Sequence, residues 1–160
     1  MYKRQGVWGT GSVAQAPTLV SATPGGSTSA TQTFALTGRD TNGFADIQRF
    51  YFLVNGNAFI PAGSCHGFYD RASNTIFLYN DALSAVTGPL TPGATGILSN
   101  GQCAINGAGS SATASGTDVV LNMRITRHGS YATGLRNLYV WITDAANTGT
   151  GWVPASSWTL

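Results

Sequence analysis

The feature that most constrains the fold of this 160-residue chain is its lack of glutamate, combined with a single lysine, Lys3. Glutamate and lysine are the strong helix formers that usually cover the exposed face of a helix. Charged residues make up only 9% of the chain, whereas an average globular protein has about 25%. Hydrophobic residues nevertheless account for 42%, so the low charge does not indicate disorder. The sequence therefore predicts a folded, all-β domain.

The charge and hydropathy patterns argue against two classes of partner. The net charge is only +2 and the bases form no extended run, so the chain lacks the basic surface that holds nucleic acid through its phosphates. No run of apolar residues is longer than five, whereas a membrane-spanning helix needs about 20. We therefore expect neither nucleic-acid binding nor insertion into a membrane.

The first sixteen residues are expected to lie outside the folded domain. Met1–Gln5 matches the translated end of a transposon adapter used in sequencing libraries, and residues 6–16 have the small-residue composition of a flexible linker. Residues 1–16 are therefore interpreted as adapter-derived residues plus a linker. Residues 17–160 are interpreted as one domain, whose length suits a single hydrophobic core.

Alternation of apolar and polar side chains predicts the strands. Residues 117–126 show the clearest period of two, and residues 31–37 and 137–143 repeat it. Residues 48–55 are expected to form a strand that is buried on both faces at its centre. No helical period of any length occurs, which favours a β-sandwich. The apolar faces of these segments define the predicted core: Phe34, Leu36, Phe52, Val54, Val119, Leu121, Met123, Ile125, Leu138, Val140 and Ile142.

Two segments between the alternating strands have a different composition. Residues 65–80 are expected to form a hairpin, because two strand-like runs flank a turn. Residues 81–116 are rich in Gly, Ser, Pro and Ala, and we expect a long packed loop there with one short strand near residues 102–105. Seven or eight strands are predicted in all.

The chain contains two cysteines, Cys65 and Cys103. An even number of cysteines in a Gly-rich chain with almost no Glu or Lys fits an oxidising compartment. We expect a disulfide that pins the long loop to the hairpin; the alternative is a pair of buried free thiols. Zinc is not favoured, because it needs about four ligands and neither His66 nor His128 has a ligand spacing to the cysteines.

Three segments carry a resemblance to a known family: Thr31–Asp46 with its Asp-Thr-Asn-Gly turn, the strand Gln48–Asn55, and Leu138–Asn147 with its Thr-Asp-Ala-Ala-Asn end. They resemble the bacterial immunoglobulin-like (Big or fibronectin-III-like) modules of secreted and cell-surface proteins. The resemblance implies an immunoglobulin-like β-sandwich that is extracellular and non-catalytic. The insertion between Cys65 and Cys103 departs from the minimal plan of that family, so no partner is carried over.

Catalytic motifs are hard to find in the sequence. There is no Gly-x-Ser-x-Gly elbow. His66 adjoins Cys65, which a disulfide would occupy, and His128 lies at a predicted strand end beside a glycine. We expect a protein that is not an enzyme and needs no cofactor. A Ser-His-Asp triad assembled from scattered residues is the alternative that the sequence leaves open.

Aromatic residues are the first candidates for ligand binding. Tyr139 and Trp141 lie two residues apart on the face opposite the predicted core, about 6.6–6.8 Å along the strand. Together with Tyr79 they could form a surface on which a sugar ring stacks. The alternative is that these rings pack in the core or beneath the 81–116 loop.

A second set of candidates consists of oxygen-bearing side chains. Asp40, Asn42 and Asp46 precede one predicted strand, and Asp144 follows another. If the two loops share one end of the sandwich, these oxygens could bind calcium, which prefers six to eight oxygen ligands. The set supplies barely half of them, so we favour turn and capping roles and no metal.

These observations predict a non-catalytic structural or adhesive module of a larger secreted or surface protein. The alternative is a carbohydrate-binding β-sandwich module attached to a glycan-degrading enzyme. The expected partners are therefore a glycan or the neighbouring domains of the parent chain. Exposed rings beside Asp, Asn or Arg would favour the carbohydrate hypothesis, and buried rings would favour the structural one.

Overall fold

Residues 13–160, which the computed structural model describes, form twelve β-strands and one short 3-10 turn. The strands are β1 (Thr18–Thr23), β2 (Gly26–Ser27), β3 (Thr31–Arg39), β4 (Ile47–Asn55), β5 (Cys65–Asp70), β6 (Thr75–Tyr79), β7 (Val86–Leu90), β8 (Ile97–Ser99), β9 (Cys103–Ser115), β10 (Asp118–Arg127), β11 (Leu135–Asp144) and β12 (Val153–Thr159), with the 3-10 turn η1 (Gly129–Tyr131) after β10. Among the described residues no helix has the length and the apolar character that a membrane crossing requires.

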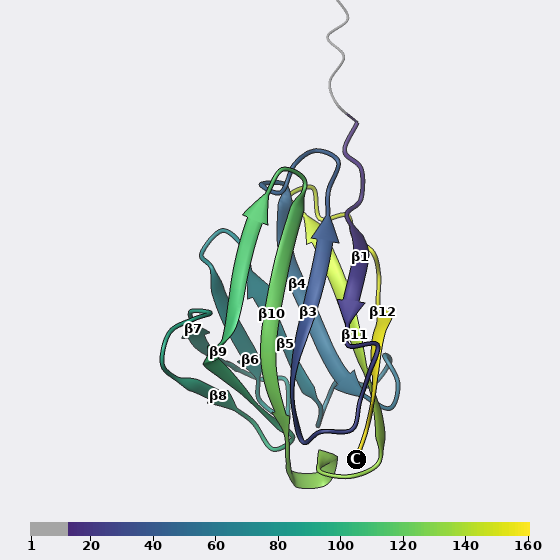
Figure 1. Cartoon of the computed structure of the whole chain (residues 1–160), viewed down its shortest axis with the longest axis vertical. Coiled ribbons are helices and arrows are strands. Elements are labelled where there is room, and N and C mark those ends of the chain that lie inside the picture. Colours follow the sequence, from purple (N-terminus) through teal and green to yellow (C-terminus); the bar gives the residue numbers. More distant parts are fainter. Residues whose placement is uncertain (1–12) are drawn as a thin grey trace, which may run out of the picture.

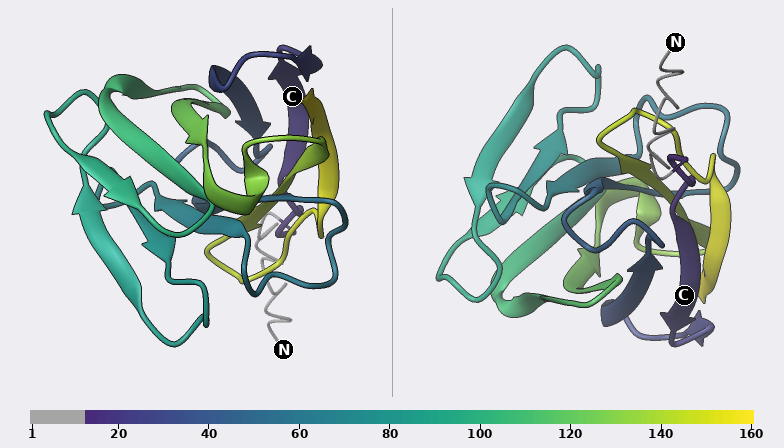
Figure 2. Two further views of the ribbon diagram at one scale, coloured as in Figure 1. Left: turned by 90° about the horizontal axis from the view of Figure 1, so that it is seen from below. Right: turned by 90° about the horizontal axis from the view of Figure 1, so that it is seen from above.

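The strands build two sheets that pack face to face (Figure 1, Figure 2). One sheet has five strands in the order β1-β3-β10-β9-β8, and the other has seven in the order β2-β12-β11-β4-β5-β6-β7. All of these pairings are antiparallel except that of β2 with β12. Contacts of β1 with β12 and of β7 with β8 join the two sheets at their edges. The predicted all-β sandwich is therefore confirmed.

The core lies between the sheets and is formed by the apolar faces that the alternation predicted. All of the predicted core residues are less than 2% exposed. Leu121, in the middle of β10, pairs with Leu36 on one side and with Ala112 on the other. Phe34 meets the ring of Trp158 edge-on, with centroids 5.0 Å apart. The strand β12 thus contributes the largest fully buried side chain.

A disulfide between Cys65 and Cys103 joins the two sheets, and the predicted pairing is confirmed. Cys65 begins β5 of the seven-stranded sheet and Cys103 begins β9 of the five-stranded sheet, with their Cα atoms 5.5 Å apart. Both residues are fully buried. The bridge joins residues 38 positions apart, and closing a loop of that length stabilises a fold by about 3–4 kcal/mol.

The segment 81–116 is not the long packed loop that its composition suggested, because it contains β7, β8 and the whole of β9. The structure therefore has more strands than the seven or eight predicted. In β9 small residues such as Gly107 and Ser110 occupy buried positions. A Cβ at Gly107 would lie 2.5 Å from the carbonyl oxygen of Ala94. The close approach of the Ala94 backbone therefore requires glycine at this buried position of β9. Because glycine has no apolar side chain, the alternation of apolar and polar residues cannot be seen in this part of the sequence.

The predicted N-terminal extension is only partly covered by the structure. Residues 1–12 of the segment interpreted as adapter and linker lie outside the described residues. Residues 13–16 are exposed and belong to no strand. The Gln15 N–H donates to Asn42 Oδ1 at 3.0 Å, so this segment contacts the loop between β3 and β4.

Arg127, at the end of β10, is a buried cation held by backbone carbonyl groups. The residue is 3% exposed. Its guanidinium donates to the carbonyl oxygens of Tyr131 (2.6 Å), Gly134 (2.7 Å) and Trp158 (2.7 Å). It also lies 5.2 Å from the centre of the Trp158 ring. One side chain therefore fixes the turn after β10 and the strand β12 against each other.

Removing the disulfide should destabilise the sandwich. The double variant Cys65→Ala, Cys103→Ala should lose about 3–4 kcal/mol of unfolding free energy, because its unfolded chain is no longer cross-linked. Chemical denaturation of the variant beside the wild type measures the difference. Alkylation of the denatured, non-reduced wild type should label no cysteine, and two labelled cysteines would contradict the bridge.

The assignment of the core face is tested on β10. Leu121→Ala should lower the unfolding free energy by about 2–5 kcal/mol, because this side chain is fully buried. Asn122→Ala is the matched control on the opposite face; it loses a hydrogen bond to Ser111 Oγ and should cost less than about 1 kcal/mol. Equal losses in urea denaturation would show that the faces of β10 are assigned incorrectly.

Candidate functional site

The outer face of the seven-stranded sheet carries a row of aromatic side chains. Because β4 pairs with both β11 and β5, Tyr51 lies between Trp141 and Phe68. Phe77 of β6 continues the row beyond Phe68, and these two rings stack with centroids 5.0 Å apart. Four adjacent strands therefore contribute one ring each at the same level of the sheet.

A second row lies two residues further along β4. Leu53 pairs with Tyr139 of β11 on one side and with His66 of β5 on the other. The His66 ring meets the Tyr79 ring edge-on at 4.7 Å. Leu53 is 0% exposed although it does not belong to the core between the sheets. Neighbouring side chains therefore cover this part of the outer face.

Trp152, from the segment between β11 and β12, packs against both rows. Its ring meets the Trp141 ring edge-on at 5.8 Å and the His66 ring edge-on at 5.7 Å, an arrangement that aromatic pairs prefer. Gly149 makes room for this packing. A Cβ there would lie 2.5 Å from Trp141 Nε1 and 2.5 Å from the Ile142 carbonyl oxygen.

These rings border a cleft of about 390 Å³, which we call the aromatic cleft. It is lined by Tyr51, His66, Tyr79, Trp141, Thr143, Asn147 and Trp152. Its volume falls within the range of about 300–1,000 Å³ that is usual for small-molecule sites. Trp141 is 37% exposed, so its ring is open to solvent. The aromatic cleft thus combines apolar walls with a few polar groups.

Arg49 organises the charged groups beside the cleft. Its guanidinium lies 4.8 Å from the centre of the Phe68 ring, and it donates to Tyr51 Oη at 3.2 Å and to Asp70 Oδ2 at 3.3 Å. Although burial acts in the opposite direction, hydrogen bonds from Ser73 and Arg49 lower the pKa of the Asp70 carboxyl. Asp70 is therefore ionised at neutral pH and paired with Arg49.

His66 is the titratable imidazole in the wall of the cleft. Burial lowers the pKa of His66 from 6.5 to about 4, because the charged form loses its hydration. Its Nδ1 atom is buried and has no hydrogen-bond partner. At neutral pH His66 is therefore uncharged and contributes an aromatic edge to the wall.

The structure brings together two of the three aromatic residues that the sequence singled out. Trp141 and Tyr79 both line the aromatic cleft. Tyr139 lies on the same face but is not among the lining residues; its hydroxyl accepts a hydrogen bond from Asn137 Nδ2 at 3.3 Å. None of the lining residues comes from the segment 81–116.

The other five lining residues were not among the leading aromatic candidates from the sequence. Tyr51 and His66 come from β4 and β5, and Thr143 comes from β11. Their place on the outer face follows from the period of two once the strand pairing is known. Asn147 and Trp152 lie in the segment after β11, where no periodicity gives a signal.

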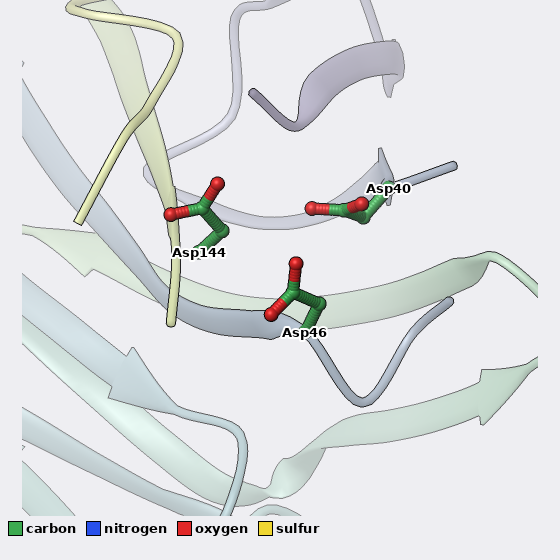
Figure 3. A group of neighbouring side chains, drawn as sticks. All are labelled: Asp40, Asp46 and Asp144. Atoms are coloured by element: carbon green, nitrogen blue, oxygen red, sulfur yellow. The ribbon is translucent and has the colours of Figure 1, made fainter. Parts of the chain in front are cut away.

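The second candidate site, at another place in the fold, is a group of three carboxylates. Asp40 follows β3, Asp46 precedes β4 and Asp144 ends β11, and the three side chains converge (Figure 3). One oxygen from each lies within 4.8 Å of the others. The two loops meet at one end of the sandwich, since Ala145 N–H donates to the Asp46 carbonyl oxygen at 2.9 Å. The side-chain oxygen of Asn42 instead accepts from a backbone N–H of the N-terminal segment.

The Asp40 carboxyl lies in the least hydrated part of this group. Asp40 and Asp144 are both 0% exposed. Burial raises the pKa of Asp40, and the charges of Asp46 and Asp144 raise it further, while a hydrogen bond from the Asn42 N–H acts in the opposite direction. The burial of Asp40 and its two carboxylate neighbours therefore disfavour the charged form of Asp40.

One serine–histidine contact lies outside both candidate sites. Ser99 Oγ is 3.3 Å from His128 Nε2. Within residues 13–160 no carboxylate forms a hydrogen bond or an ion pair with His128. The pair thus lacks the third group that orients the histidine of a catalytic triad.

Comparisons with protein-family models, curated proteins and solved structures found no match to this chain. The immunoglobulin-like resemblance thus stays a prediction from the sequence. Function has to be inferred from the geometry of the two candidate sites and from the disulfide.

The buried, neutral state of His66 makes stability depend on pH. Between pH about 6.5 and about 4, His66 is protonated in the unfolded chain but stays neutral in the folded chain. The unfolding free energy should therefore fall by at most about 1.4 kcal/mol for each pH unit by which the pH is lowered in this window. His66→Gln should decline less steeply than the wild type across this window. Urea denaturation at a series of pH values measures both slopes, and identical slopes would contradict a buried, neutral His66.

Proposed function

We propose that the chain is a non-catalytic, immunoglobulin-like β-sandwich module that binds a glycan in the aromatic cleft. The observation that carries the proposal is the grouping of Trp141, Trp152, Tyr51 and Tyr79 around one cleft of about 390 Å³. A flat aromatic ring offers an apolar surface that matches the C–H face of a pyranose, and the amphipathic Trp and Tyr side chains also carry hydrogen-bonding groups. Trp141 is the most suitable stacking platform, because it is 37% exposed.

The polar groups of the cleft favour a neutral glycan. Thr143 and Asn147 line it and offer both donors and acceptors, which suits sugar hydroxyl groups that also do both. The charged side chains beside it, Arg49 and Asp70, pair with each other. His66 in the wall is uncharged at neutral pH, because burial lowers its pKa to about 4. The lining residues therefore present no unpaired charge that would favour a charged sugar.

An extracellular or cell-surface location is supported by the buried disulfide between the sheets. Such bridges persist in oxidising compartments and are rare in the cytosol. The resemblance to modules of secreted bacterial proteins points in the same direction. A glycan-binding module in that location would act on extracellular polysaccharide or on a cell surface.

A purely structural or adhesive module is the second candidate function. It is favoured by the edge-on contacts of Trp152 with Trp141 and His66, because rings that already pack against one another do not need a ligand to cover their apolar surface. In that case the aromatic face would only cover the outside of the sheet. The two functions differ in whether replacing an exposed ring changes binding.

Affinity electrophoresis through gels that contain neutral polysaccharides separates these functions. We expect at least one polymer to retard the wild type, and Trp141→Ala to weaken the retardation by at least about tenfold, which corresponds to about 1.4 kcal/mol of lost stacking. Phe59→Ala is the matched control, because Phe59 is 90% exposed in the loop between β4 and β5 and does not line the cleft. It should leave the retardation unchanged.

Two results would contradict glycan binding in the cleft. One is mobility of the wild type that is unaffected by every polymer in the panel. The other is an equal loss of retardation in Trp141→Ala and Phe59→Ala, which would indicate nonspecific adhesion through exposed rings. Thermal melting of each variant checks that the fold is intact before the mobilities are compared.

A further inference from the structure

We propose that Asp40, Asp46 and Asp144 form a calcium site at the end of the sandwich where β3 and β11 end. This site is additional to the glycan function and does not depend on it. Asp40 and Asp46 lie at the two ends of the loop between β3 and β4, and Asp144 comes from the end of β11, far along the sequence. One carboxylate oxygen from each lies within 4.8 Å of the other two. Oxygens that bind one calcium ion at 2.3–2.6 Å lie at most about 5 Å apart, so the spacing fits a single shared ion.

An unpartnered buried oxygen is the independent observation that points to a ligand. Asp40 is 0% exposed. Its Oδ1 accepts a hydrogen bond from the Asn42 N–H at 2.8 Å, but its Oδ2 is buried without any hydrogen-bond partner. Figure 3 shows an oxygen of Asp40 directed toward the space between Asp46 and Asp144. Buried carboxylate oxygens are costly unless a hydrogen bond, a cation or a metal compensates them.

Basic side chains do not provide that compensation. Among residues 13–160 the ion pairs are Arg39 with Asp118 and Arg49 with Asp70. Arg71 lies next to the cluster, but its guanidinium donates to the carbonyl oxygens of Ala45 and Ile47. Within residues 13–160 the three carboxylates therefore have no counter-ion within salt-bridge distance.

Contacts with the surrounding chain hold the Asp144 carboxylate and the Asp46 backbone in place. Both oxygens of Asp144 accept hydrogen bonds from Thr148, one from its N–H at 2.8 Å and one from its hydroxyl. The Asp46 backbone is tied to the loop after β11 through the N–H of Ala145. Ordered ligands lose little conformational freedom when an ion binds. The cluster is thus arranged for a ligand before the ligand arrives.

The donor set selects the class of cation. All of the candidate ligand atoms are carboxylate oxygens, which hard cations prefer over the nitrogen and sulfur ligands of zinc. Calcium tolerates irregular geometry and completes its shell with water, whereas magnesium demands a tighter octahedron. An open depression lined by Ala14, Asn42, Ala45 and Asp46 reaches the cluster at Asp46.

The test compares thermal melting in EDTA with melting in millimolar CaCl2, together with calorimetric titration of CaCl2 into EDTA-treated protein. Because a ligand that binds only the folded state stabilises it, calcium should raise the melting temperature of the wild type by at least about 5 °C. Asp46→Asn should show no calcium-dependent rise. In EDTA it should melt at or above the temperature of the wild type, because it removes repulsion inside the cluster; this result separates loss of the site from loss of the fold.

Asp81→Asn is the matched control, because it makes the same change of charge in the turn after β6. The asparagine retains the side-chain oxygen that accepts from the Gly101 N–H. This variant should respond to calcium as the wild type does. The proposal is overturned if calcium neither shifts the melting temperature of the wild type nor releases heat, if Asp46→Asn keeps the full shift, or if Asp81→Asn loses it. An equal shift in MgCl2 would overturn the assignment to calcium.

Discussion

The position of β4 at the centre of the seven-stranded sheet is the constraint on which both the core and the aromatic cleft depend. Phe50 and Phe52 belong to the buried core, while Tyr51 and Leu53 lie on the outer face. The register of β4 with β11 and β5 sets which rings stand next to one another on that face. A slip of one residue would exchange the two faces and would move Phe52 out of the core and Tyr51 into it.

The fold class could be predicted because the period of two is intact where the core is deepest. Strand β10 shows it most clearly, since Leu121 and Met123 point inward and both are fully buried. The disulfide could be predicted from the count of cysteines, because two cysteines have only one possible intramolecular pairing. The sequence left open whether Asp40 and Asp144 meet, because only the structure shows that β3 and β11 end on the same side of the sandwich (Figure 1).

The aromatic cleft could be predicted only in part, because it depends on pairings between distant strands. Tyr51 and His66 become neighbours of Trp141 and Trp152 through the order of strands in the sheet, which no local pattern contains. Trp152 also lies outside any alternating segment. The strands within residues 81–116 were missed for a different reason: close packing at Gly107 requires a residue without a side chain, so the apolar signal is absent where the strand is most confined.

The pairing of β3 with β10 and of β4 with β11 has a consequence for the rate of folding. The partners are far apart along the chain: Arg39 and Asp118, which meet across β3 and β10, are separated by 79 residues, and Thr31 and Thr126 by 95. Forming such contacts costs the entropy of closing long loops before burial of apolar surface compensates for it. Sandwiches of this topology therefore fold in milliseconds to seconds rather than in microseconds. The hairpins β5–β6 and β9–β10, joined by short turns, can form early. Because Cys65 and Cys103 begin one strand of each hairpin, oxidation would hold the two hairpins together and shorten the search for the remaining strands.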